Sequence, residues 1–411
     1  MKITFISPFY PNIWEPLWAG MLTSYLKQVF HSDLDVRFFH GNFDNERSMI
    51  QEGVKSDIVA FSCTTPTFKA GYRIAKVIKA KNPKVKILMG GWHATSAKIF
   101  FDEVIDHVIY GEGETAFFSL INSGLWRDRT VINNDYQISF SELPWPDRKL
   151  IRQDRTLKLC EDMCGERIGS VQSIRGCKFR CKMCSEKCMT GDSNIRVRDP
   201  NDTLDEIEYL IRDYNINRVK FVDPTLTIDE KHVWEFCEEK IRRGIDIKFD
   251  AMLHASTATE GMIQIMAAAN CDVFMVGVES GDQRILNDIN KGTTISKIER
   301  VFKWGKKYGI NRRAFFILGT PLEDMKSIEN TRKLIYGISP DIVGFTILTP
   351  FPGNSYYRDE FKDVDWSKCN EYTNDFWYCP SFTNEELKQI QKKLNKEFEH
   401  ILISHQRIIN D

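Results

Sequence analysis

The sequence has no apolar run near the roughly 20 residues that span a bilayer, and its N-terminus lacks the apolar stretch of a signal peptide. It also has almost no net charge: the formal value is −1, with Lys and Arg spread along the chain. The composition therefore gives no electrostatic argument for nucleic acid or a membrane surface as partner. Neither an internal repeat nor a low-complexity tract is present. We expect a cytoplasmic protein without a membrane span.

What the chain does have is length, apolar residues and cysteine. Its 411 residues, 42% of them hydrophobic, exceed one ordinary core and predict two or three packed domains. Eleven cysteines in such a chain favour reduced thiols and metal ligands over disulfides.

Three cysteines, Cys177, Cys181 and Cys184, lie within eight residues, separated by three and then by two residues. Three thiolates can hold a 4Fe–4S cluster and leave its fourth iron open to a small molecule, whereas a cluster with four cysteines only transfers electrons. Cys188 follows after three more residues, so a zinc site or a ferredoxin-like cluster that uses all four cysteines is the alternative. Zinc sites usually pair two close ligands with two distant ones, and this run has no such gap.

Strand and helix patterns alternate in residues 1–125. β-Branched and aromatic runs predict strands at 2–7, 34–39, 57–62, 85–90 and 107–110. The alternation predicts an α/β fold with a doubly wound, Rossmann-like parallel sheet, whose ligands bind beyond the carboxyl ends of the strands. The residues expected at that edge are Ser7, Cys63, Thr64, Thr65, Gly90, Gly91, Trp92, His93, Gly111, Glu112 and Gly113.

A second alternating series begins near residue 170. Residues 126–169, with Pro144-Trp145-Pro146, are predicted to be a linker. Six further strands are predicted at 171–175, 217–222, 246–252, 272–278, 313–318 and 342–348. Six strands are too few to close an eight-stranded barrel, so we expect a partial (β/α)6 barrel over 170–353.

The remaining residues, 354–411, are predicted to form a C-terminal cap. An aromatic stretch leads into a helix at Thr383, which forms a capping box with Glu386. The apolar stripe of that helix, which includes Leu387, is expected to pack on the barrel.

The stretch SIRGCKFRCKMCSE, from Ser173, resembles the signature of the radical S-adenosylmethionine (SAM) superfamily. The segments FVD, GVESGDQRILNDINKG, FILGTPLED and TPFPGN resemble further motifs of that superfamily, in the same order. The resemblance implies a 4Fe–4S cluster on the three cysteines and SAM on its open iron. It also implies a SAM site made by Met183, Asp223, Glu279, Ser280 and Gly319, with Glu279 on the ribose and with Arg312 or Arg313 as the partner of the SAM carboxylate.

The runs MGGWHATS and VIYGEGE, with WEPLWAGMLTSYL, resemble the cobalamin-binding domain that precedes many radical SAM domains. Gly90 and Gly91 would let the backbone approach a large planar ligand closely. The Asp-x-His-x-x-Gly motif that ligates cobalt elsewhere is absent, so we expect cobalamin without a histidine ligand, its lower face against residues 63–68. His93 is as consistent with a structural role as with contact to the ligand.

Together the resemblances imply a cobalamin-dependent radical SAM enzyme that methylates an unactivated carbon of a metabolite or natural product, using a 5'-deoxyadenosyl radical and methylcobalamin. They imply a small-molecule or peptide substrate and an external electron donor such as flavodoxin or ferredoxin; the sequence names no catalytic side chain. One alternative is rearrangement, cyclisation or ring contraction without methyl transfer. The other is a protein that is not an enzyme, either an iron-sulfur electron carrier or a zinc-stabilised binding protein.

Overall fold

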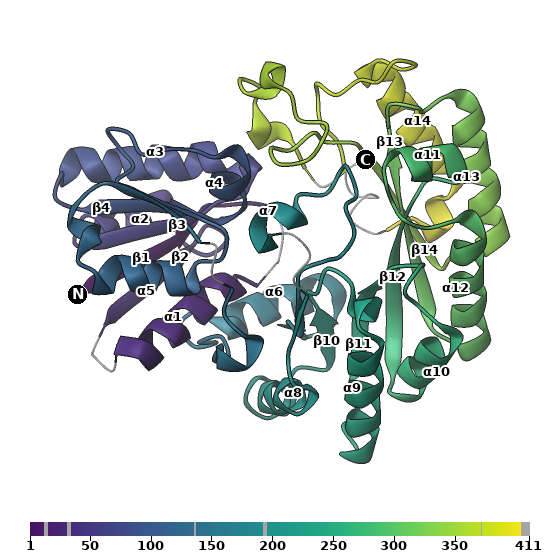
Figure 1. Cartoon of the computed structure of the whole chain (residues 1–411), viewed down its shortest axis with the longest axis horizontal. Coiled ribbons are helices and arrows are strands. Elements are labelled where there is room, and N and C mark those ends of the chain that lie inside the picture. The colour runs from purple at the N-terminus through teal and green to yellow at the C-terminus, as the bar shows by residue number, and fades with distance from the viewer. Residues whose placement is uncertain (12–14, 31–33, 135–136, 192–194, 371, 404–411) are drawn as a thin grey trace. The chain divides into compact units, whose positions relative to one another are not determined.

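The structure is a computed structural model that describes residues 1–11, 15–30, 34–134, 137–191, 195–370 and 372–403. It divides into two compact units, each with its own parallel sheet (Figure 1). Unit 1 comprises Met1–Gly165, Ser185–Asp192 and Phe351–Gly353, and unit 2 comprises Glu166–Cys184, Ser193–Pro350 and Asn354–Asp411. None of the described helices is long and apolar enough to cross a membrane.

Unit 1 is built on a six-stranded parallel sheet in the order β2-β1-β3-β4-β5-β6. Its strands are β1 (Lys2–Ser7), β2 (Asp35–His40), β3 (Ile58–Ser62), β4 (Lys86–Gly90), β5 (His107–Tyr110) and β6 (Thr130–Asn133). Its helices are α1 (Leu17–Phe30), α2 (Glu46–Gly53), α3 (Thr65–Lys81), α4 (Gly91–Ala97), α5 (Glu114–Asn122), α6 (Gln153–Cys164) and α7 (Glu186–Thr190).

Alternate residues of β3 enter two different cores. Ile58 and Ala60 pack with residues of α1 and α5, whereas Val59 and Phe61 pack with residues of α2 and α3. Both faces of the sheet are therefore covered by helices, as Figure 1 shows, which confirms the predicted doubly wound fold.

The segment predicted as a linker adds structure to unit 1 instead. Residues 130–133 form β6, which extends the sheet beside β5, and α6 follows from Gln153. Lys27 pairs with Asp147 at 2.8 Å, and the Arg152 guanidinium donates to Asp44 at 2.9 Å. These ion pairs connect the segment to the ends of α1 and β2, so it is part of the first unit.

Unit 2 is built on a second six-stranded parallel sheet in the order β14-β13-β12-β11-β10-β7. Its strands are β7 (Ile168–Val171), β10 (Arg218–Phe221), β11 (Lys248–Leu253), β12 (Cys271–Glu279), β13 (Asn311–Leu318) and β14 (Ile342–Ile347). A separate two-stranded antiparallel sheet pairs β8 (Ile174–Arg175) with β9 (Arg196–Val197). In the described residues β7 and β14 are the edge strands and do not pair with each other, as expected for a partial barrel.

The helices of unit 2 follow the strands and pack against one another in chain order, α8 on α9, α9 on α10, α10 on α12 and α12 on α13 (Figure 1). They are α8 (Pro200–Tyr214), α9 (Glu230–Arg242), α10 (Glu260–Ala268), α11 (Gln283–Asp288), α12 (Ile295–Tyr308), α13 (Met325–Ile338) and α14 (Asn384–Glu397).

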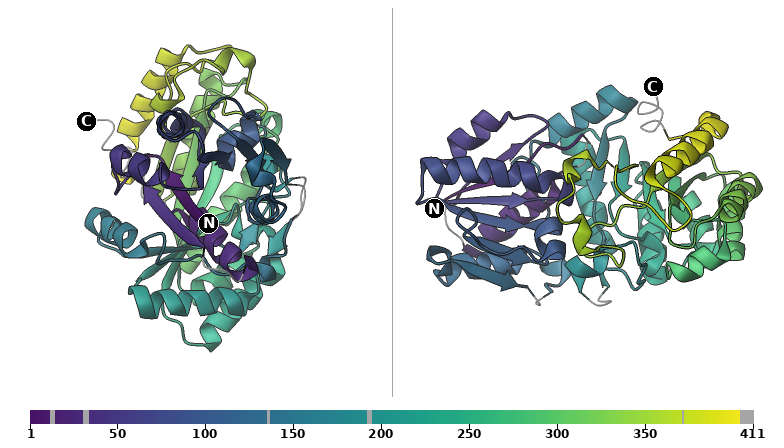
Figure 2. Two further views of the ribbon diagram at one scale, coloured as in Figure 1. Left: turned by 90° about the vertical axis from the view of Figure 1, so that its left-hand side faces the viewer. Right: turned by 90° about the horizontal axis from the view of Figure 1, so that it is seen from above.

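The C-terminal helix α14 begins as predicted. Thr383 and Glu386 form the capping box, and Leu387 is fully buried. The Gln391 amide donates to the carbonyl oxygen of Phe345 in β14 at 2.8 Å, so α14 packs on the last strand (Figure 2).

Candidate functional site

The three predicted cluster ligands lie on one loop of unit 2, which leaves β8 through Gly176 at a φ of +90°. Cys177 and Cys181 are half-buried and Cys184 is exposed. The amide of Cys184 donates to the carbonyl of Cys181 at 3.1 Å, and the Cys181 thiol interacts electrostatically with those of Cys177 and Cys184. Burial raises the pKa of the Cys181 thiol to about 12; the Lys291 ammonium opposes this rise and the Glu279 carboxylate adds to it.

A thiol with such a pKa is protonated near neutral pH, and it loses its proton when a metal binds. No group of three or more His, Cys, Asp or Glu side chains in the described ranges is arranged to hold a single metal ion. A 4Fe–4S cluster places each thiolate on a different iron, and three thiols on one loop fit that donor set.

One side of the cysteine loop is held by residues 288–292, which follow α11. The amide of Lys182 donates to the carbonyl of Ile289 at 2.9 Å, and the Asn290 side chain donates to the carbonyl of Arg180 at 3.0 Å. The sequence had indicated this segment as part of a SAM motif but not its contacts with the loop.

The other side of the loop is held by the turn after β14. The Asn354 side chain donates to the carbonyl oxygens of Met183, at 3.4 Å, and Thr349, at 3.1 Å, and the amide of Ser355 donates to the carbonyl of Lys182 at 2.8 Å. TPFPGN was predicted as a turn, but this role of Asn354 was not; an amide that directly follows Pro-Gly was the available signal.

Asp223, at the end of β10, anchors the start of the loop. Its buried carboxylate accepts hydrogen bonds from the amides of Ser173, at 2.7 Å, and Ile174, at 2.9 Å, and from the Ser173 hydroxyl at 2.6 Å. Burial raises the pKa of Asp223 to about 6, and these hydrogen bonds oppose that rise. The carboxylate therefore positions the turn before Cys177, and its expected contact with SAM stays a prediction.

Glu279 ends β12 in the left-handed region, at a φ of +65°. It forms an ion pair with Lys291, with 2.6 Å between Oε1 and Nζ, and both side chains are about nine-tenths buried. A side chain at Gly277 would collide with both members of this pair, so the glycine leaves room for it. Ser280 is buried beside them, and its hydroxyl accepts from the amide of Asp282 at 3.1 Å, where α11 begins.

The structure does not support Arg312 or Arg313 at this site. Both lie near the start of β13, whereas the cysteine loop and Glu279 follow the carboxyl ends of their strands. The Arg312 guanidinium pairs with Asp341 at 2.8 Å, and the charge of Arg313 acts on Asp250 of β11. The two arginines do lie in the predicted strand, but they are at its amino-terminal end, away from the proposed site.

Gly319, expected to face adenine, directly follows β13 at a φ of +86°. Its carbonyl accepts a hydrogen bond from the Trp377 indole at 2.7 Å, and an added Cβ would lie 2.8 Å from Leu387. Its amide donates at 3.1 Å to Glu323, whose pKa is raised to about 7 by burial. The C-terminal aromatic stretch thus covers this strand end.

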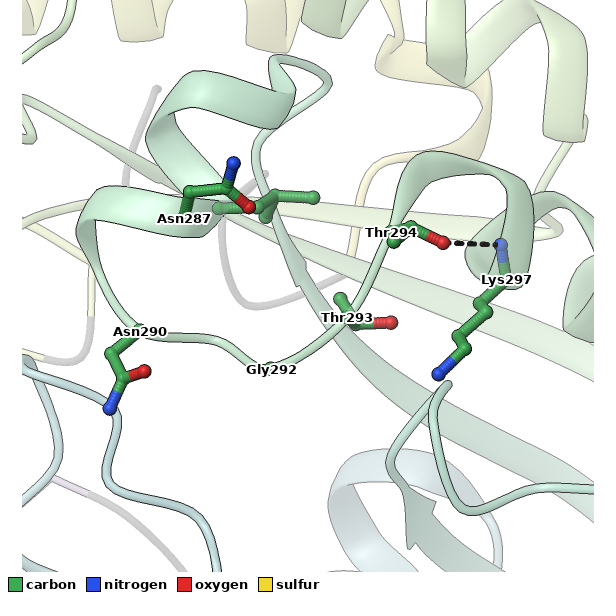
Figure 3. A pocket seen from close by; sticks show the side chains of 7 residues that line it. Asn287, Asn290, Gly292, Thr293, Thr294 and Lys297 are labelled. Carbon is green, nitrogen blue, oxygen red and sulfur yellow. Dashed lines mark hydrogen bonds between the residues drawn. The ribbon is translucent and has the colours of Figure 1, made fainter.

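A pocket of about 240 Å³ lies between α11 and α12 (Figure 3). The Thr294 hydroxyl in it caps the amide of Lys297 at 3.3 Å, and the side-chain oxygen of Asn287 accepts from the Gln283 side chain at 2.8 Å. Both bonds occupy polar groups of the pocket; the first caps α12 and the second lies along α11. The pocket is lined by Leu286, Asn287, Asn290, Gly292, Thr293, Thr294 and Lys297.

In unit 1 the predicted cobalamin-binding residues follow β1, β3, β4 and β5. These strands are neighbours in a parallel sheet, so their carboxyl ends form one edge. An added Cβ at Gly90 would meet nothing nearer than 3.8 Å, whereas one at Gly91, at a φ of +81°, would lie 2.5 Å from the Ser62 hydroxyl. Phe9 is 62% exposed and Trp92 is 39% exposed on segments that leave this edge, which gives it apolar surface.

His93 is turned into the protein. It is buried, its Nδ1 lies 3.2 Å from the Thr65 hydroxyl, and its ring lies against Phe68 with 4.1 Å between centroids. Burial lowers the pKa of His93 to about 4, so it is neutral near pH 7. Of the two roles left open for His93, the structural one fits these contacts.

The other predicted residues of this edge also have protein contacts. Ser7 accepts from the Trp18 indole at 3.3 Å, Gly111 donates its amide to Thr95 at 3.0 Å, and the carbonyl of Glu112 accepts from Asn134 at 2.7 Å. Cys63 is buried, which raises its thiol pKa to about 12; Thr64 caps α3, and Gly113 precedes α5.

Cys188 belongs to α7, which is part of unit 1 and packs on α4. Its thiol donates to the carbonyl of Gly353 at 3.4 Å, and an added Cβ at Gly353 would lie 2.8 Å from that sulfur. The fourth cysteine of the run is therefore packed in a different unit from the other three.

Comparisons with known proteins agree with this division. Residues 9–121 match the B12 binding domain, and residues 171–335 match the radical SAM superfamily. The chain is a radical SAM enzyme with a B12-binding domain. This family uses a 4Fe–4S cluster, SAM and cobalamin as cofactors.

This radical SAM enzyme is similar to two relatives and one solved structure over most of its length. It is 28% identical to an uncharacterized methyltransferase of Pyrococcus horikoshii, over 90% of the chain and 85% of the relative. It is 27% identical to the anaerobic magnesium-protoporphyrin IX monomethyl ester cyclase of Rubrivivax gelatinosus, over 91% and 73%. Its fold resembles that of the radical SAM methyltransferase TsrM of Kitasatospora setae, with a TM-score of 0.69, 16% identity, and coverage of 86% and 74%.

Proposed function

We propose that this cobalamin-dependent radical SAM enzyme is a methyltransferase that acts on an unactivated carbon of a metabolite or natural product. When bound, the cluster with SAM supplies a carbon radical and cobalamin supplies the methyl group. The relative from Pyrococcus horikoshii, similar over most of both chains, supports methyl transfer.

In this proposal the residues of unit 2 bind and orient the cofactors of radical formation. Cys177, Cys181 and Cys184 hold three irons of the cluster, and Asn354 with residues 288–292 fixes the shape of their loop. Glu279 accepts hydrogen bonds from the ribose hydroxyls of SAM. An external one-electron donor, such as flavodoxin or ferredoxin, supplies the electron.

The observation that carries the cobalamin part is the open edge at Gly90. A Cβ added at Gly90 would contact only the carbonyl oxygens of Ile109 and Phe61, at 3.8 and 3.9 Å, so nothing in the protein crowds this backbone. Next to the exposed Phe9 and Trp92, it suits a wide planar ligand. Because the His93 ring is neutral, buried and in contact with Thr65 and Phe68, we propose that cobalt takes no histidine from this edge.

The test is the stoichiometry of the two products of SAM. Under anaerobic conditions with reductant, cobalamin and the true substrate, a methyltransferase of this kind should form 5'-deoxyadenosine and S-adenosylhomocysteine in near-equal amounts, each matching the methylated product. Turnover that forms 5'-deoxyadenosine without S-adenosylhomocysteine would exclude methyl transfer and leave the radical SAM chemistry intact.

That second outcome would favour the alternative function, a rearrangement or cyclisation without methyl transfer. The relative from Rubrivivax gelatinosus is named as a cyclase and is similar over 91% of this chain, so this candidate has its own support. A product of unchanged carbon number would identify it.

A further inference from the structure

Residues 288–292 do more than complete a SAM motif, because they also contact the backbone of the cysteine loop. Besides the contacts of Ile289 and Asn290, Asp288 pairs with Lys182 of the loop at 3.0 Å. An added Cβ at Gly292 would lie 3.2 Å from the ring of Phe179. The loop and this segment therefore run side by side from Phe179 to Lys182.

His254 fixes the backbone of Lys291 from a third direction. Its Nε2 donates to the carbonyl of Lys291 at 2.9 Å, its Nδ1 accepts from the amide of Ser256 at 3.2 Å, and its ring stacks on Phe179 at 3.6 Å between centroids. The backbone of Lys291 is thus held by His254, which directly follows β11, and lies in a segment that contacts the cysteine loop. Its Nζ reaches Glu279 at 2.6 Å, and it also interacts electrostatically with Cys181 and Cys184.

We propose that Lys291 is a positioning residue that orients Glu279 and places a positive charge beside the cluster ligands Cys181 and Cys184, which raises the reduction potential of the cluster. The inference rests on the proposed ligand assignment. Reduction adds one electron from the external donor to the cluster and breaks no bond. A nearby cation stabilises the more negative reduced state, and a nearby anion destabilises it.

The ion pair therefore predicts shifts of opposite sign for its two members. Lys291→Met should lower the midpoint potential of the cluster, with the ratio of reduced to oxidised cluster at a fixed potential falling about tenfold, which corresponds to about 59 mV for a one-electron couple. Glu279→Gln should raise the midpoint, and the double variant should lie between the two. Lys297→Met is the matched control: it removes a lysine charge from the first turn of the following helix α12, where the amine lies 3.4 Å from the Ser256 hydroxyl.

The experiment is an anaerobic redox titration of the reconstituted full chain, without SAM, followed by electron paramagnetic resonance of the reduced cluster. The absorbance of the oxidised cluster in each variant first shows that the cluster is assembled. Opposite shifts for Lys291→Met and Glu279→Gln, with Lys297→Met at the wild-type value, support the inference. General damage to the loop would move both potentials in the same direction.

Two failures are distinguishable. If the wild-type chain assembles no 4Fe–4S cluster, the ligand assignment itself is wrong. If the wild-type cluster assembles and Lys291→Met keeps the wild-type midpoint, or shifts it no more than Lys297→Met does, the inference is overturned while the ligand assignment stands. If Lys291→Met alone fails to assemble a cluster, Lys291→Arg, which keeps the charge, decides: wild-type potential supports the inference and a shift like that of Glu279→Gln contradicts it.

Discussion

The carboxyl edges of the two sheets are made from different materials. The edge of the first sheet is backbone and apolar surface: Gly90 has no close neighbour, Trp92 is partly exposed, and His93 is neutral and buried. The edge of the second sheet carries charged groups that have partners: Glu279 forms an ion pair with Lys291, and the buried Asp223 accepts hydrogen bonds from the turn before the cysteines. Two similar parallel sheets thus have edges of opposite character, and the cofactor site proposed at each edge can be disrupted separately.

The largest effect is expected at the cysteines. Replacing Cys177, Cys181 or Cys184 by Ala should abolish the 4Fe–4S absorbance and SAM cleavage, because the cluster loses one of three protein ligands. Cobalamin retention through gel filtration should persist, since the first sheet does not contribute to the loop. Cys188→Ala is the control within the same run: its thiol contacts the Gly353 carbonyl, so it should keep both cluster and cleavage. Equal loss in Cys188→Ala would refute the open-iron proposal.

A matched disruption of the other edge is Gly90→Val. Gly90 has a φ of −140°, which any residue adopts, and nothing within 3.8 Å of its added Cβ, so the protein should fold. A side chain there should weaken cobalamin retention at least about tenfold, equivalent to about 1.4 kcal/mol, because backbone can no longer approach the ligand. Equilibrium dialysis with hydroxocobalamin measures it, and cluster content is the control. Gly91→Val is less informative, because its side chain would strike Ser62 in the protein itself.

The smallest effect is expected from His93 and tests whether its buried ring is neutral in the folded protein. Its folded pKa of about 4 lies below the ordinary 6.5, so the neutral ring contributes stability that is complete above pH 6.5 and is lost as the pH falls toward 4. Between about pH 7.5 and about pH 5 this group should cost roughly 2 kcal/mol. In the His93→Gln variant no side chain titrates at this position. Over the same pH interval its free energy of unfolding in urea should therefore fall by roughly 2 kcal/mol less than that of the wild-type protein. Equal losses in both proteins would mean that the ring is not buried in its neutral form.

Much of this arrangement could be predicted, because it rests on local patterns. The strand Lys2–Ser7 and the capping box of Thr383 appear where β-branched residues and a Thr-x-x-Glu pattern placed them. The strand β6 was missed because it lies at the sheet edge and is at most half-buried, so its apolar pattern is weak. The equally short β5 is mostly buried, and its apolar run was recognised.

The ion pair of the second edge could not be read from the sequence for a different reason. Lys291 reaches Glu279 only because the chain turns through a left-handed residue and returns past α11, and Gly277 leaves room for it. The spacing of residues in the sequence does not show that the chain folds back in this way. The arginines of β13 show the converse error: a suitable charge in the right strand lies at the end where it meets Asp341.

The helix α7 has a consequence for recombining such enzymes. It begins two residues after Cys184, yet it packs on α4, where Gln137 and Gly353 hold it through Thr190 and Cys188. A chimaera that exchanged only residues 1–165 would pair a foreign α4 with the native α7. A transplant of the cobalamin module should therefore carry residues 185–192 and 351–353 with it, so the exchangeable module is discontinuous along the gene.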